Sequence, residues 1–286
     1  MGELLYFAET TLLWIVAVFF LLGIGWRIFF FIVSIFRRRR FSRHRVWHRF
    51  FTLVGALVPF HRAVLKKPVY AAVRYTFHAC MLIVPIWFSG HVYLWEESRF
   101  EWYWTPLPDA WADWMTLSVL AACVFFLARR IILKNRFKAG ISDFLLILIT
   151  GLPFLTGYFL THGNLNSIPF FENYLWYFHV ISGEIMLAMI IFLFCRTRLR
   201  EETCVGCAAC VENCPTETLE FYDKDTFRFF RYSHYQCICC GSCVNVCPEN
   251  AATLNHAISL KHFFRMFSKN VIRNVDLSTC KRCGVT

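Results

Sequence analysis

The sequence predicts an all-α transmembrane bundle of five helices followed by a small α+β domain. Three observations support this fold class. The 286 residues are 57% hydrophobic and 19% aromatic, with a mean hydropathy of +0.47 that is too high for an ordinary soluble domain. Long apolar runs fill the first two thirds of the chain, and eleven of the fourteen cysteines lie after residue 200 in spacings typical of metal ligands. The N-terminal part is therefore expected to contact lipid and the C-terminal part to bind metal.

Each predicted membrane helix is an apolar run long enough to cross about 30 Å of hydrocarbon. The first run is too long for a signal-peptide core, and the residues around its start include Glu3 and Glu9 in place of a basic region. We therefore expect it to remain as the first membrane helix. The five runs lie at about 7 to 35, 69 to 95, 110 to 133, 141 to 162 and 174 to 195.

The distribution of basic residues predicts the orientation of the bundle. The strings RRRRFSRHR, ARRIILKNRFK and RTRLR follow the first, third and fifth runs, whereas the two other loops hold one Arg between them. By the positive-inside rule the N-terminus is outside, and everything after residue 196 is cytoplasmic. We expect a multi-pass protein of the cytoplasmic (inner) membrane. The net charge of +11 then reflects membrane topology, and no nucleic acid binding is expected.

The connecting segment 41 to 68 is basic and aromatic. Two interpretations are open for it: a segment lying along the inner membrane surface, or a solvated loop that only sets topology. After residue 199, the strings TLEF and TFRFFRY are typical of strands. The tail ISLKHFFRMFSKNVIRNV places apolar residues near helical spacing between basic ones, and it ends in CKRC.

Two cysteine motifs, CVGCAACVENCP and CICCGSCVNVCP, dominate the C-terminal part. In such a run, three thiolates sit on one tight loop around a cubane corner, and the fourth reaches the other cluster. Zinc sites typically draw their four ligands from cysteine or histidine pairs, and not from interleaved triplets. The predicted ligands of the first 4Fe-4S cluster are Cys204, Cys207, Cys210 and Cys247, and those of the second are Cys237, Cys240, Cys243 and Cys214.

These motifs resemble those of the bacterial two-cluster ferredoxins over about residues 200 to 254. The resemblance implies a pseudo-symmetric, dicluster ferredoxin-like fold and one-electron transfer without bond chemistry of its own. Cys239 lies where such ferredoxins usually carry Gly, and we interpret it as a non-ligand. The terminal Cys280 and Cys283 supply two ligands of an incomplete extra metal site or form a free or redox-active pair.

Four histidines lie in or at the ends of the predicted spans, where ionisable residues usually serve a function. His91, His162 and His179 fall at one depth near the outer face, and His78 lies about 20 Å deeper along the second span. Two neutral imidazoles facing each other across a helical bundle are a common axial pair for a low-spin haem. Gly90 and Gly183 leave room for a macrocycle, although either glycine alone is more often a helix-packing residue.

Five spans, an outside N-terminus and the strings FSGHVY and YFHVISGE resemble the membrane cytochrome b family of respiratory nitrate reductase gamma subunits and of heterodisulfide-reductase-type membrane subunits. The resemblance covers about residues 1 to 198 and implies b haem, with Arg27 of WRIFF placed to meet a haem propionate. The alternative for Arg27 is a snorkelling side chain at a helix end.

The sequence departs from that family because the end of the fifth span, FLFCRTRLR, has no His. We therefore expect one haem between His91 and His179, with His162 as a rival ligand. A second haem would require His78 and an unidentified partner, or a His/Met site that uses Met186.

We thus divide the chain into a five-span cytochrome b-like domain (1–198), a two-cluster ferredoxin-like domain (199–254) and a basic amphipathic tail (255–286). The resemblance implies an electron-transfer subunit of a respiratory complex that reacts with menaquinone or another quinone. Its expected partners are a cytoplasmic heterodisulfide-reductase-like or flavin subunit and a periplasmic multihaem cytochrome c.

The sequence contains no catalytic triad, phosphate loop or dinucleotide fingerprint, so substrate chemistry is expected on a partner. The rival hypothesis is a haem-free, membrane-anchored ferredoxin in maturation or regulation. A transporter coupled to ferredoxin oxidation is a weaker alternative, because Glu184 is the main acidic residue within the spans.

Overall fold

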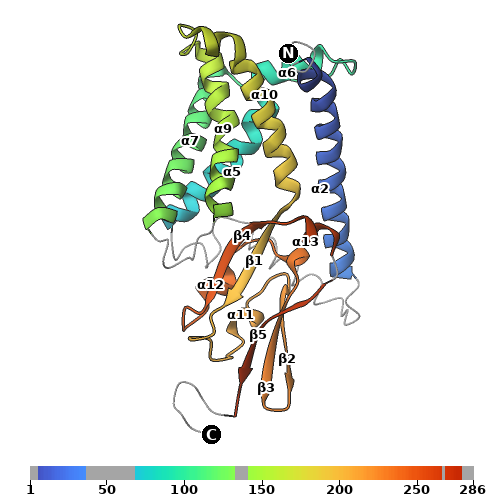
Figure 1. Ribbon diagram of the computed structural model, residues 1–286, viewed down its shortest axis with the longest axis vertical. Coiled ribbons are helices and arrows are strands. Elements are labelled where there is room, and N and C mark those ends of the chain that lie inside the picture. The colour runs from blue at the N-terminus through green and yellow to red at the C-terminus, as the bar shows by residue number, and fades with distance from the viewer. Residues whose placement is uncertain (1–5, 37–67, 133–140, 266–267, 279–286) are drawn as a thin grey trace. The chain divides into compact units, whose positions relative to one another are not determined.

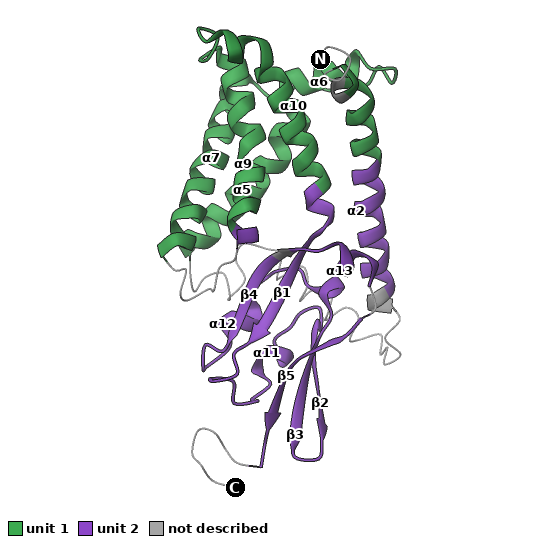
Figure 2. Ribbon diagram, viewed as in Figure 1, with its two compact units in different colours: residues 1–18, 68–136, 144–188 green, residues 19–67, 137–143, 189–286 purple. Residues whose placement is uncertain are grey.

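The computed structural model describes residues 6–36, 68–132, 141–265 and 268–278, with five long helices followed by strands and short helices (Figure 1). The chain divides into two compact units (Figure 2). The first comprises residues 1–18, 68–136 and 144–188, and the second comprises 19–67, 137–143 and 189–286. The segment 41 to 67 and the terminal CKRC lie outside the described residues.

The five long helices confirm the predicted number of membrane-compatible helices. All five are long and apolar enough to cross a bilayer. Many of their large apolar side chains are exposed in the isolated chain, which suits a lipid environment. The helices are α2 (Leu13–Phe36, preceded by the π turn η1, Ala8–Leu12), α5 (Pro68–Trp87), α7 (Asp109–Ile132), α9 (Ile141–His162) and α10 (Pro169–Ile191).

The second predicted span, 69 to 95, is interrupted. Phe88 adopts extended backbone angles between α5 and a short helix, α6 (Ser89–Glu96). The carbonyls at the end of α5 find partners on the loop that follows α6. The amide N–H of Leu107 donates to the oxygen of Trp87 at 2.7 Å, and the indole of Trp104 donates to the oxygen of Ile86 at 3.0 Å. The break therefore leaves these two helix-end carbonyls satisfied.

The fifth predicted span, 174 to 195, is also shifted. The helix α10 begins at Pro169 and ends at Ile191, and residues 193 to 195 belong to a strand. Arg27 explains part of this end, because its Nη1 donates to the carbonyl oxygens of Ile190 and Ile191 at 3.1 and 3.2 Å. A cation at the last carbonyls of a helix stabilises its C-terminus.

Within the first unit, α5 packs against α7 through aromatic contacts. The ring of Phe126 meets Tyr70 at a centroid distance of 6.0 Å and Phe77 at 5.5 Å. Gly151 of α9 lies so close to Cys123 of α7 that a Cβ at this glycine would come within 3.3 Å of the Sγ atom. A small residue thus permits the close approach of α9 and α7.

The described residues of the second unit form two antiparallel sheets. Strand β1 (Leu193–Leu199) pairs with β4 (Ala252–Ile258), and β3 (Phe227–Tyr232) pairs with both β2 (Leu219–Lys224) and β5 (Asn270–Asp276). The strands β2 and β3 confirm the strand prediction for TLEF and TFRFFRY. The short helices are α11 (Ala209–Glu212), η2 (His234–Gln236), α12 (Ser242–Asn245) and α13 (Leu260–Phe264). Leu219, Phe230, Tyr232 and Val275 are almost fully buried among the cysteine loops.

Within the described part of the tail, the helical spacing corresponds to a helix in α13 alone. Residues 270–276 form β5 instead, with Val275 opposite Arg228 on β3. The outer edge of β3 offers unpaired backbone groups, and pairing with them satisfies the tail's own backbone. The register shifts between Phe230 and Arg231, because Ile272 of β5 is skipped in the pairing.

Candidate functional site

Two short loops present the cysteines, and both use left-handed backbone conformations. In the first loop, Gly206 (φ 77°) and Ala208 (φ 60°) flank Cys207. In the second loop, Cys239 (φ 56°) and Gly241 (φ 77°) flank Cys240. Each loop then enters a short helix, α11 or α12, that carries the third cysteine of the triplet. The two halves therefore share one backbone design, which curls each triplet around a common centre.

The first triplet comes together with a cysteine from the other half. Cys204 and Cys210 interact electrostatically with Cys207 and with Cys247, and all four line one cavity. Leu199, Phe230 and Ala251 complete its apolar wall. The amide N–H of Ala251 donates to the Sγ atom of Cys247 at 3.2 Å. Backbone donors of this kind stabilise a thiolate sulfur.

The second triplet is arranged in the same way. Cys237 and Cys243 interact electrostatically with Cys240 and with Cys214 from the first motif. Hydroxyl groups lie near three of these sulfur atoms: Thr197 at 4.0 Å from Cys243, Ser242 at 3.4 Å from Cys240, and Thr216 at 3.8 Å from Cys214. The predicted ligand sets require this grouping, in which each triplet lies near the fourth cysteine of the other motif.

The spacing of these thiols suits a centre larger than one ion. Four sulfur ligands around a single zinc lie about 3.8 Å apart, as Zn–S bonds of about 2.3 Å require. Among the described residues, the triplet cysteines form no group of three ligand atoms within 4.8 Å of one another. A 4Fe-4S cube, which holds its thiolates farther apart, therefore fits this donor set better than zinc does.

Burial keeps the uncoordinated thiols protonated. It raises the pKa of Cys210 to about 12 and that of Cys237 to about 11, with the neighbouring cysteines adding to the shift. At neutral pH these groups are thiols until a metal displaces their protons. The positive charge of bound iron therefore compensates the thiolate charge that the apolar surroundings disfavour.

In the first unit, the structure brings His91 and His179 together. Their ring centroids lie 6.0 Å apart, and the ring planes differ by 9°. His91 follows the break at Phe88, and its buried Nδ1 is near the Pro85 carbonyl without making a hydrogen bond of good geometry. The interruption of the second span is thus the local feature that positions this imidazole.

The helix α9 fixes the ring of His179. Its Nδ1 lies 3.0 Å from the Pro153 carbonyl oxygen and 3.2 Å from the Thr156 hydroxyl. A carbonyl oxygen only accepts, so Nδ1 carries the proton and Nε2 keeps its lone pair. A Cβ at Gly157 would lie 3.0 Å from Cε1 of His179, and the glycine therefore provides the space for the ring.

The other predicted histidines have protein partners. His162 contacts the Tyr158 carbonyl through Nδ1 at 3.0 Å and the Asp113 carboxylate through Nε2 at 3.3 Å. His78 is exposed on α5 with Nδ1 2.7 Å from the Arg74 carbonyl. Met186, named with His78 for a second site, is buried in α10. The ring contacts found among the described residues do not join His78 to another histidine.

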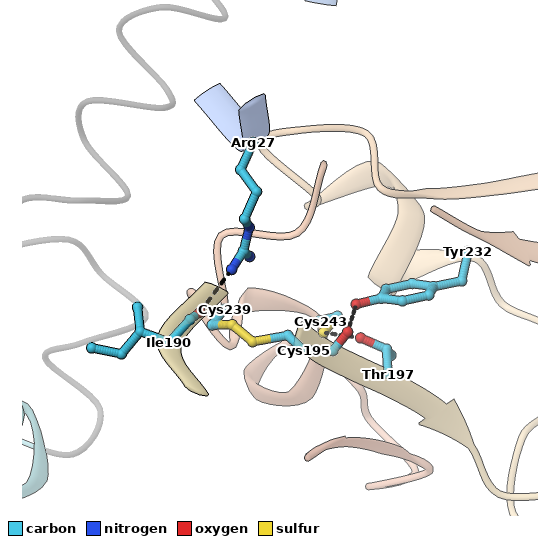
Figure 3. The surroundings of a disulfide bond; sticks show 7 residues. All are labelled: Arg27, Ile190, Cys195, Thr197, Tyr232, Cys239 and Cys243. Carbon is cyan, nitrogen blue, oxygen red and sulfur yellow. Dashed lines mark hydrogen bonds between the residues drawn. A yellow bond between two sulfur atoms is a disulfide. The ribbon is translucent and has the colours of Figure 1, made fainter. Parts of the chain in front are cut away.

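One sulfur pairing was not anticipated. Cys239, interpreted from the sequence as a non-ligand, forms a disulfide with Cys195 of β1 (Figure 3). The signal was present in the sequence as a cysteine at the loop position that Gly206 occupies in the other motif. It was missed because Cys195 is remote in sequence and was assigned to the end of the fifth span.

Comparisons with known proteins agree with the cysteine site. Residues 197–254 match the family described as 4Fe-4S dicluster domain. A protein of Nitratidesulfovibrio vulgaris Hildenborough, described only as "Protein", is 29% identical over 138 residues. That alignment covers 48% of this chain and 58% of the relative, so the chain spans little more than half of the relative's length. No solved structure matches significantly. The chain thus joins five membrane-compatible helices to an α+β domain that contains a 4Fe-4S dicluster domain.

Proposed function

We propose that this protein is a membrane electron-transfer subunit that holds two 4Fe-4S clusters and one b-type haem. The observation that carries the proposal is the interleaving of the two cysteine triplets, each completed by the fourth cysteine of the other motif. Residues 204, 207, 210 and 247 would hold the first cluster, and residues 237, 240, 243 and 214 the second. Clusters of this kind exchange single electrons at potentials set by burial and by hydrogen bonds to their sulfur ligands.

The protein's own residues set the surroundings of the clusters. Leu199, Phe230 and Ala251 restrict water at the first site. Thr197 and Ser242 bring hydroxyl groups to the sulfur atoms of the second site. Extra donors to the sulfurs favour the reduced, more negative state.

The haem belongs between His91 and His179. These imidazoles come from two different helices, have ring centroids 6.0 Å apart, and would hold the haem iron from two sides. Pro153 holds His179 in the tautomer that offers Nε2, and Gly157 clears space for its ring. A low-spin b haem supplies one-electron transfer without a site for oxygen. His162 is less suitable, since both of its nitrogens have partners.

The finer role is an electron path across the inner membrane, with the N-terminus outside and the clusters in the cytoplasm. Quinone, such as menaquinone, would react near the outer haem, and a periplasmic multihaem cytochrome c is the alternative exchange partner. On the cytoplasmic side a heterodisulfide-reductase-like or flavin subunit would carry the substrate chemistry. Support for this role comes from the apolar helices and from the charge pattern of their loops.

A pyridine haemochrome assay with iron and sulfide counts on the anaerobically purified full chain tests the proposal. We expect one haem and about eight cluster irons. His179→Ala should remove the haem and keep the clusters, whereas the matched control His162→Ala should keep both. Full b-type absorbance in His179→Ala would refute the haem assignment. Clusters without haem in the unaltered chain would favour a membrane-anchored ferredoxin.

A further inference from the structure

A third group of metal- or redox-competent side chains lies outside both cluster sites. Cys195, Cys239 and His256 bring their ligand atoms within 4.8 Å of one another. Cys195 on β1 is the register partner of His256 on β4, and Cys239 approaches from the second cysteine loop. The two cysteines form a disulfide with a Cα–Cα distance of 5.9 Å, well inside the usual range for such bonds.

The disulfide is joined at both ends to the second cysteine site (Figure 3). Cys239 directly precedes Cys240, a proposed cluster ligand. On the other side, Thr197 follows Cys195 by two residues on β1 and reaches the sulfur of Cys243 at 4.0 Å. Tyr232, almost fully buried, donates its hydroxyl to the Cys195 carbonyl. The bond thus lies beside the sulfur atoms that would carry the second cluster.

Two further features distinguish this bond from an ordinary structural link. Cys239 adopts a left-handed conformation at the position where the first loop has Gly206, so a strained cysteine replaces the residue that suits the turn. The two sulfurs also differ in access: Cys195 is 3% exposed, whereas Cys239 is only half-buried. In a dithiol, Cys239 would therefore be the sulfur that meets an external molecule, and Cys195 the buried, resolving one.

We propose that Cys195 and Cys239 are a redox-active disulfide that links one-electron iron-sulfur transfer to two-electron thiol chemistry. In the reductive direction the S–S bond breaks, and two electrons, delivered one at a time by the two iron-sulfur clusters, together with two protons yield two thiols. His256 is placed to pass a proton to Cys195. The source of electrons rests on the proposed function, whereas the pairing of the two sulfurs does not.

The substrate class is an external disulfide. The Cys239 thiolate attacks one sulfur of the substrate and releases the first substrate thiol, leaving a mixed disulfide. The Cys195 thiolate then attacks Cys239, which releases the second thiol and re-forms the Cys195–Cys239 bond. Each cycle thus converts one substrate disulfide into two thiols. On the cytoplasmic side predicted from the loop charges, disulfides are typically transient and catalytic or redox-sensing.

Thiol trapping on the full-length protein in detergent tests this inference. Anaerobic samples, with and without reduced viologen as the electron donor, are alkylated and mapped by mass spectrometry. Cys195 and Cys239 should be blocked before reduction and should become alkylated together after it. Subsequent addition of glutathione disulfide should block both again and release glutathione.

Two variants separate redox activity from a structural role. Cys239→Gly places glycine in the same left-handed position as Gly206, so the loop should fold and keep its iron. It should lose viologen-driven reduction of glutathione disulfide, and Cys195→Ser should lose it too. Retention of this activity in Cys239→Gly, or a bond that stays closed after both clusters are reduced, would overturn the inference.

A third metal is the competing outcome. Stoichiometric zinc in the unaltered protein that disappears in both variants would assign the three side chains to a metal site and overturn the redox role. Iron and sulfide counts distinguish this failure from that of the proposed function. If the clusters are absent, dithiothreitol replaces viologen as the reductant in the trapping experiment. Failure of Cys195 and Cys239 to form a disulfide in that experiment would still overturn the inference.

Discussion

His234 should make the stability of the cluster domain depend on pH. The residue begins η2, between the two cysteine loops, and is 6% exposed. Its ring centroid lies 3.8 Å from that of His262, and its Nε2 lies 3.2 Å from the side-chain nitrogen of Asn270. Burial lowers the pKa of His234 to about 4, with the positive charge of Arg196 and the nearby His262 adding to the effect. The folded domain thus holds this imidazole neutral.

The sign of the effect follows from the two protonation equilibria. An unfolded His binds its proton near pH 6.5, whereas folded His234 does so only near pH 4. Between these values the unfolded state holds more protons, so the free energy of unfolding falls as the pH is lowered from about 6.5. At pH 5 the loss is up to about 2 kcal/mol relative to neutral pH. For a domain of this size it lowers the melting temperature by roughly 8 to 16 °C.

Loss of cluster absorbance on heating measures this effect in the full chain between pH 7.5 and pH 5. Acid also attacks the cluster thiolates, so the matched variant His234→Gln is the control. It retains an acceptor for Asn270, carries the same cysteines and lacks the titrating group. We expect its melting temperature to fall less steeply with decreasing pH. Equal slopes in the two proteins would refute the reasoning.

Three further outcomes follow from the structure. Cys207→Ala should lose about half of the cluster iron and sulfide while a haem, if bound, stays in place, and metal analysis that finds all eight irons would contradict the ligand set. Gly206→Ala should destabilise the domain by about 1 to 2 kcal/mol, because φ at this position is 77° and the new Cβ would lie 3.2 Å from Val275. Chemical denaturation measures this loss, and an unchanged midpoint would contradict the prediction. Leu219→Ala, at a position 1% exposed, should cost about 2 to 5 kcal/mol in the same assay, and a loss below 1 kcal/mol would exclude a core role.

The parts of the fold that depend on composition and period were predictable from the sequence. A run such as Asp109–Ile132 is apolar over the thickness of a bilayer, and no packing partner is needed to recognise it. The strands around Phe221 and Phe230 were predictable because aromatic residues and flanking turn residues favour a hairpin. The two cysteine triplets could be recognised from their spacing, and the assignment of Cys214 and Cys247 to the opposite triplets stays a prediction from the general pattern of such motifs.

The parts that depend on long-range pairing were not predictable. The helix α10 ends before Phe192 although the apolar run continues, because Leu193 pairs with Ile258 on β4. Asn270–Asp276 joins β3 for the same reason, despite its helical spacing. The Cys195–Cys239 bond depends on this strand, because a helical Cys195 would not lie opposite His256. The close approach of His91 and His179 likewise requires the break at Phe88.

The packing of β5 against the first cysteine loop can form only late in synthesis. Val275 and Leu277 lie against Gly206 in the first cysteine loop, and Arg273 forms an ion pair with Glu201 just before that loop. Synthesis runs from the N-terminus, so the loop leaves the ribosome well before the strand that packs against it. We expect the first site to remain open to iron delivery until β5 has been translated and has paired with β3. A nascent chain stopped before residue 270 would expose these thiols to the solvent.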